Sequence, residues 1–271
     1  MFPIRDINPA RSTPVVTYVL IAANVLVFFY QATLDERASQ DLADTLGLKP
    51  AFVVGYLRGE KERSLRTDEV VGDVFGRRVL VREERAVAVD FFNAILPFLT
   101  SMFLHGGLMH LLGNLWFLHI FGDNVEDRLG KLRYLFFYLA TGLAAGLAQV
   151  VVAPRSTIPC IGASGAISGI LGAYFCLFPS ARVVAAVPII FIIRLFELPA
   201  VIFILIWFGM QLLSGLVTPA GQPGVAWWAH IGGFLIGVLL VLVRQARTVR
   251  PDERSSRYGQ VRDVPFRIER D

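Results

Sequence analysis

Charged side chains are scarce in this sequence. Asp, Glu, Lys and Arg make up 18% of its 271 residues, against about 25% in an ordinary soluble domain, whereas hydrophobic residues make up 55%. Cysteine is nearly absent, and two cysteines allow one disulfide at most. No glycine-rich phosphate loop follows a predicted strand, and the net charge is only +4. These features exclude a disordered chain, a nucleic-acid-binding domain and a typical cytosolic enzyme, and they indicate a lipid bilayer as solvent.

Long stretches without charge predict the membrane spans. The stretch between Arg11 and Asp35 contains 23 residues, enough for one helix across a bilayer. The stretch between Glu197 and Arg244 contains 46 residues, roughly 69 Å of helix, so we expect the Pro- and Gly-rich segment 218–224 to divide it into two spans. Six spans are predicted in all, within residues 12–34, 91–122, 134–154, 156–181, about 200–216 and 225–243.

The loops between the spans predict the orientation. Five basic residues follow the second and fourth spans, whereas Arg155 alone follows the third and fifth. The positive-inside rule therefore places both termini in the cytoplasm. These are the N-terminal segment 1–13 and the polar tail 245–271, which we expect to be disordered because it lacks apolar periodicity.

Two connecting segments need separate interpretation. The first loop, about residues 35–95, has mixed charge and is long enough to escape the charge rule, so we expect it outside the cytoplasm. The segment of about residues 181–199 is apolar, but it carries Arg182, Arg194 and Glu197 and two prolines. We interpret it as an interfacial loop.

A strongly polar side chain inside a span costs a few kcal/mol and is a candidate for function. Ser164 lies in Gly-Ala-Ser-Gly at the start of the predicted fourth span, and His230 lies in Ala-His-Ile-Gly-Gly in the sixth. Glycine-faced helices can bring the imidazole within hydrogen-bond reach of the hydroxyl, which is the minimal arrangement for a serine nucleophile. The sequence offers no buried carboxylate to orient the imidazole, so we expect a dyad. Taken alone, Ser164 is better explained as a small packing residue.

His110 and Asn114 lie four residues apart in the predicted second span and share one helical face. Both can donate hydrogen bonds, so together with the backbone N–H of Ser164 they are suited to stabilise an oxyanion. The alternative is a polar clamp between helices without chemistry. The spacing of His105, His110 and His119 does not favour a metal site, and we predict neither a metal nor a cofactor.

Two longer motifs accompany these residues. Residues 103–114 read Phe-Leu-His-Gly-Gly-Leu-Met-His-Leu-Leu-Gly-Asn, and residues 121–130 read Phe-Gly-Asp-Asn-Val-Glu-Asp-Arg-Leu-Gly. With the motifs around Ser164 and His230, in this order and at this spacing, the sequence resembles the rhomboid family of intramembrane serine proteases. The resemblance covers most of the chain, from Pro3 to about Arg244.

The resemblance implies an all-α polytopic membrane protein with a six-helix bundle, residues 14–244, as its catalytic domain. It implies a serine endopeptidase with Ser164 as nucleophile, His230 as general base, and His110 and Asn114 as oxyanion donors, whereas His105 braces the first loop. The implied partners are single-span membrane protein substrates and the lipid bilayer. The implied location is a bacterial plasma membrane.

The sequence differs from the usual family pattern at Ser168 and in the first loop, and two other functions are to be weighed. Ser168 stands where many members carry an aromatic residue beneath the imidazole. Either its hydroxyl hydrogen-bonds the imidazole or a water beneath it, or Ser168 is simply a small residue that lets the helices touch. The charged stretch from Arg58 to Arg85 has no clear counterpart in the family. One other function is that of a catalytically inactive relative, against which the presence of both Ser164 and His230 argues. A transporter would show inverted repeats or charged pathways inside the membrane, and we find none.

Overall fold

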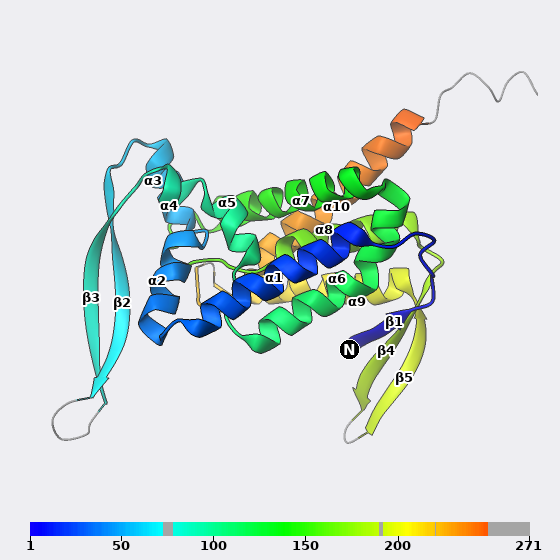
Figure 1. The fold of residues 1–271 in the computed structure, drawn as a ribbon, viewed down its shortest axis with the longest axis horizontal. Coiled ribbons are helices and arrows are strands. Elements are labelled where there is room, and N and C mark those ends of the chain that lie inside the picture. The colour runs from blue at the N-terminus through cyan, green and yellow to red at the C-terminus, as the bar shows by residue number, and fades with distance from the viewer. Residues whose placement is uncertain (73–77, 190–191, 220, 249–271) are drawn as a thin grey trace, which may run out of the picture.

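The computed structural model describes residues 1–72, 78–189, 192–219 and 221–248 (Figure 1). Six helices of 14 or more residues lie side by side along the long axis of the molecule. They are α1 (Val15–Thr33), α6 (Leu108–Leu129), α7 (Lys131–Val152), α8 (Ser164–Leu177), α9 (Ala200–Val217) and α10 (Trp227–Thr248). Four short helices precede α6, namely α2 (Glu36–Leu46), α3 (Pro50–Leu57), α4 (Phe91–Ala94) and α5 (Pro97–Thr100).

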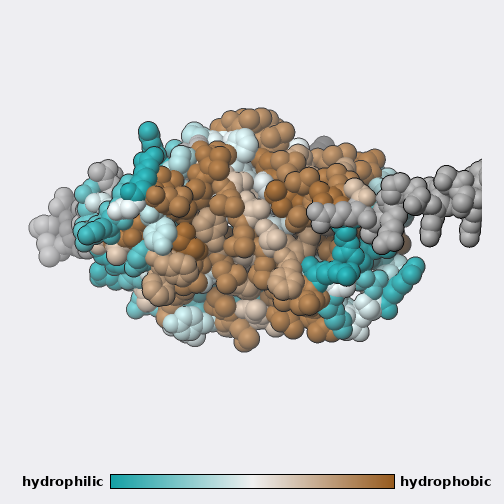
Figure 2. Space-filling model, turned by 90° about the horizontal axis from the view of Figure 1, so that it is seen from above, coloured by the Kyte–Doolittle hydropathy of each residue, from teal (hydrophilic) through white to brown (hydrophobic). Residues whose placement is uncertain are grey.

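The described helices are those of an integral multi-pass membrane protein. Four of them, α1, α7, α9 and α10, are long and apolar enough to cross a bilayer, and the segment Phe91–Phe103 with α6 makes a fifth candidate bent by 74°. Hydrophobic side chains cover the middle of the molecule and hydrophilic ones gather at both ends (Figure 2). The expected fourth span is only partly helical, because α8 has 14 residues, about 21 Å against a hydrocarbon core of about 30 Å.

The all-α prediction is wrong in one respect, because the described residues also form two antiparallel sheets. One has the order β1 (Phe2–Asp6), β4 (Arg182–Ile189), β5 (Ile192–Pro199), and the other pairs β2 (Glu62–Gly72) with β3 (Arg78–Ala88). The segment interpreted as an interfacial loop is thus a β-hairpin, with Val184 paired to both Arg5 and Glu197. Pairing satisfies the backbone hydrogen bonds of its Val- and Ile-rich strands. The prolines and charges suggested a loop, since the partner strand β1 is far away in sequence.

The two sheets lie at opposite ends of the bundle (Figure 1). The β2–β3 hairpin, from the predicted first loop, projects at one end, whereas β1, β4 and β5 lie at the other, which is also the end toward which the C-terminal part of α10 points. Of the tail predicted to be disordered, residues 245–248 continue α10, and residues 249–271 lie outside the described part of the chain.

Close contact between α8 and α10 organises the core. All residues of α8 from Ala166 to Tyr174 are buried. A Cβ atom added to Gly233 or Gly237 of α10 would collide with the backbone carbonyl oxygens of Gly165 and Gly169 of α8, respectively. Only glycine at these two positions permits such an approach of two helix backbones. This contact brings the first turns of α10 against the start of α8.

A buried carboxylate joins α6 to the start of α1. Glu126 is 1% exposed and accepts hydrogen bonds from the N–H groups of Val16 (3.0 Å) and Thr17 (2.8 Å) and from the Thr17 hydroxyl (2.8 Å). The first N–H groups of a helix have no partner within the helix, and its positive end favours an anion. Since Pro14 at the start of α1 provides no side-chain cap, Glu126 caps this helix from a neighbouring one.

Glu126→Ala is therefore expected to lower the thermal unfolding midpoint of the purified protein in detergent. Each buried donor left without an acceptor costs about 1–3 kcal/mol. Asp127→Ala is the matched control, because the neighbouring carboxylate does not cap α1. It lies near the surface and accepts from the Ser12 hydroxyl and from the backbone at Arg11 and Ser12. Equal midpoints for the two variants would contradict the capping role.

A buried lysine precedes α3. The Lys49 side chain is wholly buried, its ammonium has no hydrogen-bond partner among the described residues, and it lies 4.6 Å from the centre of the Phe52 ring. Burial lowers the pKa of Lys49 from 10.5 to about 8, an effect that Asp44 opposes and Arg85 reinforces. The charged form of Lys49 therefore destabilises the folded state.

Stability is accordingly expected to rise with pH between about 8 and 10.5. In this window the unfolded chain still binds the Lys49 proton and the folded protein releases it, whereas below pH 8 both states are protonated and the penalty is complete. Lys49→Met should raise the unfolding midpoint at pH 7 and reduce this pH dependence. Lys61→Met, at an exposed lysine, should do neither. A Lys49→Met variant less stable than wild type at pH 7 would contradict the argument.

Candidate active site

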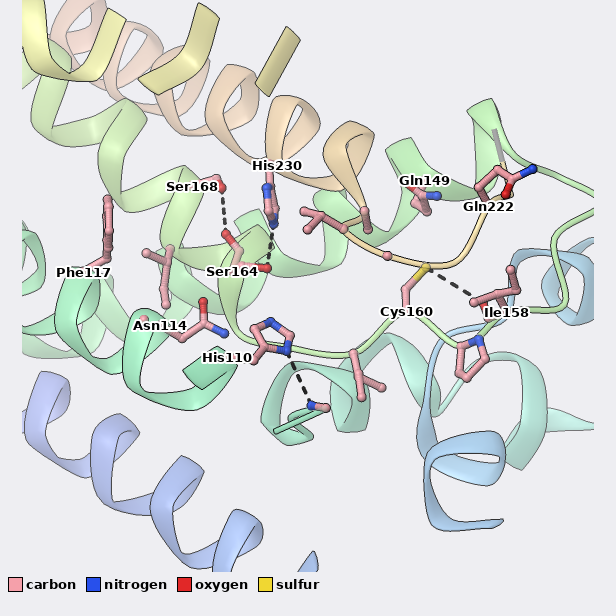
Figure 3. A pocket seen from close by; sticks show the side chains of 18 of the residues that line it. His110, Asn114, Phe117, Gln149, Ile158, Cys160, Ser164, Ser168, Gln222 and His230 are labelled. Carbon is pink, nitrogen blue, oxygen red and sulfur yellow. Dashed lines mark hydrogen bonds between the residues drawn. The ribbon is translucent and has the colours of Figure 1, made fainter. Parts of the chain in front are cut away.

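The structure brings Ser164 and His230 together. Ser164 begins α8 and His230 lies in the first turn of α10, and Nε2 of the imidazole is 2.7 Å from Oγ of the serine (Figure 3). The two residues are 66 positions apart in sequence. They meet because the glycines of α8 and α10 let the two helices pack closely. With an unprotonated Nε2, the hydroxyl donates a hydrogen bond to the imidazole.

His110 and Asn114 of α6 face the same site. Gly162, two residues before the serine, has φ +122°, and a Cβ there would lie 2.8 Å from Nε2 of His110 and 3.4 Å from Nδ2 of Asn114. The amide nitrogen of Asn114 is buried and has no hydrogen-bond partner among the described residues. Nδ1 of His110 accepts from the N–H of Gly106 at 3.4 Å, so a neutral ring carries its proton on Nε2. Two donors therefore surround the space beside Gly162.

The Ser168 hydroxyl is directed to its own helix, so the hypothesis of a direct hydrogen bond from Ser168 to the His230 imidazole is wrong. The hydroxyl donates instead to the backbone carbonyl oxygen of Ser164, four residues earlier in α8, at 2.7 Å (Figure 3). A serine inside a helix commonly satisfies its hydroxyl in this way.

His105 lies beside the site and is tied to α1. Its ring packs edge-on against His110, with centroids 5.2 Å apart. Its backbone N–H donates to Oε1 of Gln31 at 3.0 Å, and its carbonyl oxygen accepts from Nε2 of Gln31 at 3.4 Å. These contacts hold the segment before α6 against α1, and they place His105 outside the hydrogen-bonded pair.

A cavity of about 700 Å³ opens onto these groups. Its lining combines Ser164, His230, His110 and Asn114 with apolar side chains, and it includes Gln149 of α7. Polar groups gathered in an apolar cavity are typical of a small-molecule or peptide site. Within the described ranges, no three His, Cys, Asp or Glu side chains are grouped so as to hold a metal ion. Cys160 and Cys176 are both free thiols.

Three side chains contact His230 that were not predicted from the sequence: one amide and two tryptophan rings. Oε1 of Gln211, on α9, lies 2.8 Å from Nδ1 of the imidazole. The Trp207 ring stacks on the imidazole with centroids 6.3 Å apart, and Trp227 meets it edge-on at 6.2 Å. Gln211 carried the same signal as Ser164 and His230, since it is a strongly polar residue inside an apolar span.

The fold and the site define a class of protein: a helical membrane protein with a Ser–His pair that faces an internal cavity. The family model of the Rhomboid domain matches residues 93–247, which is more than half of the chain, and the chain belongs to the rhomboid family.

Several relatives match parts of the chain. RHOMBOID-like protein 6, mitochondrial, of Arabidopsis thaliana is 30% identical over 164 residues, which cover 59% of this chain and 48% of that protein. Rhomboid-like protein 11, chloroplastic, of the same plant is 42% identical over 79 residues, which cover 29% and 28%. Rhomboid protease GluP of Bacillus subtilis (strain 168) is 44% identical over 75 residues, which cover 28% and 14%. The chain spans less than half the length of each.

Proposed function

We propose that this protein is an intramembrane serine endopeptidase that cleaves peptide bonds in or near the transmembrane segments of membrane proteins. The observation that carries the proposal is the 2.7 Å contact between Ser164 Oγ and His230 Nε2 beside a cavity. Ser164 attacks the scissile carbonyl while His230 accepts its proton, and His230 then returns the proton to the leaving amine. Water in the cavity subsequently hydrolyses the acyl-enzyme.

The oxyanion of the tetrahedral intermediate is stabilised by Asn114, His110 and the N–H of Ser164. The unpartnered amide nitrogen of Asn114 supports this role, because a buried donor without an acceptor is costly unless a ligand uses it. The N–H of Ser164 lies in the first turn of α8, where N–H groups have no partner within the helix.

The substrates we propose are single-span membrane proteins, which reach the cavity from the surrounding bilayer. Residues 14–244 form a six-span catalytic domain in which α8 is a short central span. The protein resides in a bacterial plasma membrane with both termini in the cytoplasm. The position of β1 and the end of α10 at one end of the bundle, opposite the β2–β3 hairpin, supports this orientation (Figure 1).

The direct test is incubation of the detergent-purified protein with a generic single-span substrate. Wild type should release a cleaved product, and Ser164→Ala should release none. Substantial cleavage by Ser164→Ala would end the protease interpretation of this site.

The orientation predicts an accessibility pattern in intact bacterial cells. A reporter enzyme that is active only in the cytoplasm should be active when it is fused to the C-terminus. An epitope next to Glu60, in the turn before β2, should bind antibody added from outside. Permeabilised cells provide the control for epitope integrity. Finding the epitope and the reporter on the same side would refute the six-span arrangement.

A further inference from the structure

We propose that α9 positions the imidazole of His230: Gln211 sets its tautomer by accepting a hydrogen bond from Nδ1, and Trp207 supports the face of the ring. This inference rests on the proposed function and deepens it. The two residues are four positions apart, so they share the face of α9 that is turned toward α10. Gln211 and Trp207 thus orient His230 from α9, a role that a carboxylate plays in a Ser–His–Asp triad.

The orientation of the Gln211 amide follows from its second contact. Its Nε2 lies 3.3 Å from the carbonyl oxygen of Trp207, four residues earlier. A carbonyl oxygen accepts only, so the nitrogen of the amide faces Trp207 and Oε1 faces His230. Oε1 also accepts only, and at 2.8 Å it requires a proton on Nδ1 of the imidazole. A neutral His230 then has its lone pair on Nε2, which is the atom that must accept the Ser164 proton.

Two tryptophan rings restrict the movement of the His230 imidazole that the hydrogen bond to Gln211 leaves free. Trp207 lies nearly parallel to the imidazole, at an interplanar angle of 29°, and Trp227 meets it at 88°. Offset stacking and edge-on packing at centroid distances of about 4.5–7 Å are favourable. Ser168 does not contribute, because its hydroxyl is engaged with the Ser164 carbonyl oxygen. Besides its hydrogen bond with Ser164, the imidazole is thus held by the hydrogen bond to Gln211 and by two ring contacts.

A purely structural role for Gln211 predicts a different ranking of variants. If Gln211 only fills space between α9 and α10, Gln211→Leu should be harmless and Gln211→Glu should be damaging, because it places an ionisable group among buried side chains. If Gln211 positions His230, the ranking reverses. Leucine removes the acceptor, whereas glutamate keeps an oxygen in the same place.

The enzymatic test compares kcat and KM for cleavage of a single-span substrate by purified variants. Gln211→Leu should lower kcat by about 10- to 100-fold, part of the 10²–10⁴ that a general base contributes, with KM nearly unchanged. Gln211→Glu should recover most of the lost kcat, and Trp207→Leu should show a smaller loss. Leu213→Ala, at an exposed site on the same helix, is the control and should leave kcat unaltered. Wild-type kcat in Gln211→Leu would overturn the inference.

A second measurement does not require activity. The chain has four histidines, and ¹⁵N spectra of histidine-labelled protein distinguish a protonated Nδ1 from a protonated Nε2, with His230→Asn used for assignment. Wild type should show His230 protonated on Nδ1, and Gln211→Leu should lose this preference. Protonation on Nε2 in wild type would refute the inference. Equal cleavage by Ser164→Ala and wild type would refute the proposed function instead, and the spectra would still decide the role of Gln211.

Discussion

Ser164→Ala and His230→Ala are each expected to abolish cleavage, by about 10⁴–10⁶-fold in kcat, and the double variant should be no worse than either single one. The two side chains act as one unit, because the hydroxyl is a useful nucleophile only while the imidazole at 2.7 Å accepts its proton. The measurement is single-turnover cleavage of a transmembrane substrate by protein in detergent.

Thermal unfolding provides the control for this pair. Each variant removes a small or half-buried group, so the unfolding midpoints should stay close to that of wild type, and inactivity then reflects lost chemistry. Losses that multiply in the double variant would contradict a concerted dyad. They would instead indicate that one of the residues acts on a separate step.

Asn114→Ala is expected to lower kcat by about 100-fold, the low end of the 10²–10³ that loss of one oxyanion donor costs. The loss is moderate because His110, which lies beside the same glycine as Asn114, and the Ser164 N–H remain as the other two proposed donors. KM should change little, since the lost hydrogen bond forms fully only when charge develops on the oxygen. Steady-state kinetics with a soluble-tagged single-span substrate would separate the two constants.

Asn24→Ala is the matched control for this second variant. Asn24 is also a buried asparagine, but it lies on α1 and donates to the Leu20 carbonyl oxygen in its own helix at 2.7 Å. This substitution should alter stability and leave kcat unchanged. An Asn114→Ala variant with full activity and a lowered unfolding midpoint would assign Asn114 to the alternative role, a polar clamp between helices.

Much of the candidate site was predictable from the sequence because a bilayer penalises polar groups. In a soluble protein Ser164, His230 and Asn114 would be unremarkable, but within apolar spans each demands a partner or a function. The glycines at 233 and 237 also had a direct interpretation, since they allow two helices to approach closely. The structure places them against α8 as their spacing suggested.

The sequence by itself determined the membrane class and most of the helical stretches, because both follow from local composition. It also marked Ser164 and His230 as candidates, because each is a polar residue in an apolar, glycine-containing span. Tertiary structure alone decided what depends on partners distant in the chain. Strand β1 pairs with a hairpin some 180 residues away, as in the pair Phe2–Ala186, and no local pattern specifies that partner. Gln211 faces His230, and the Ser168 hydroxyl turns back to its own helix. A polar side chain can satisfy its hydrogen bonds locally or across an interface, and the packing of whole helices decides which.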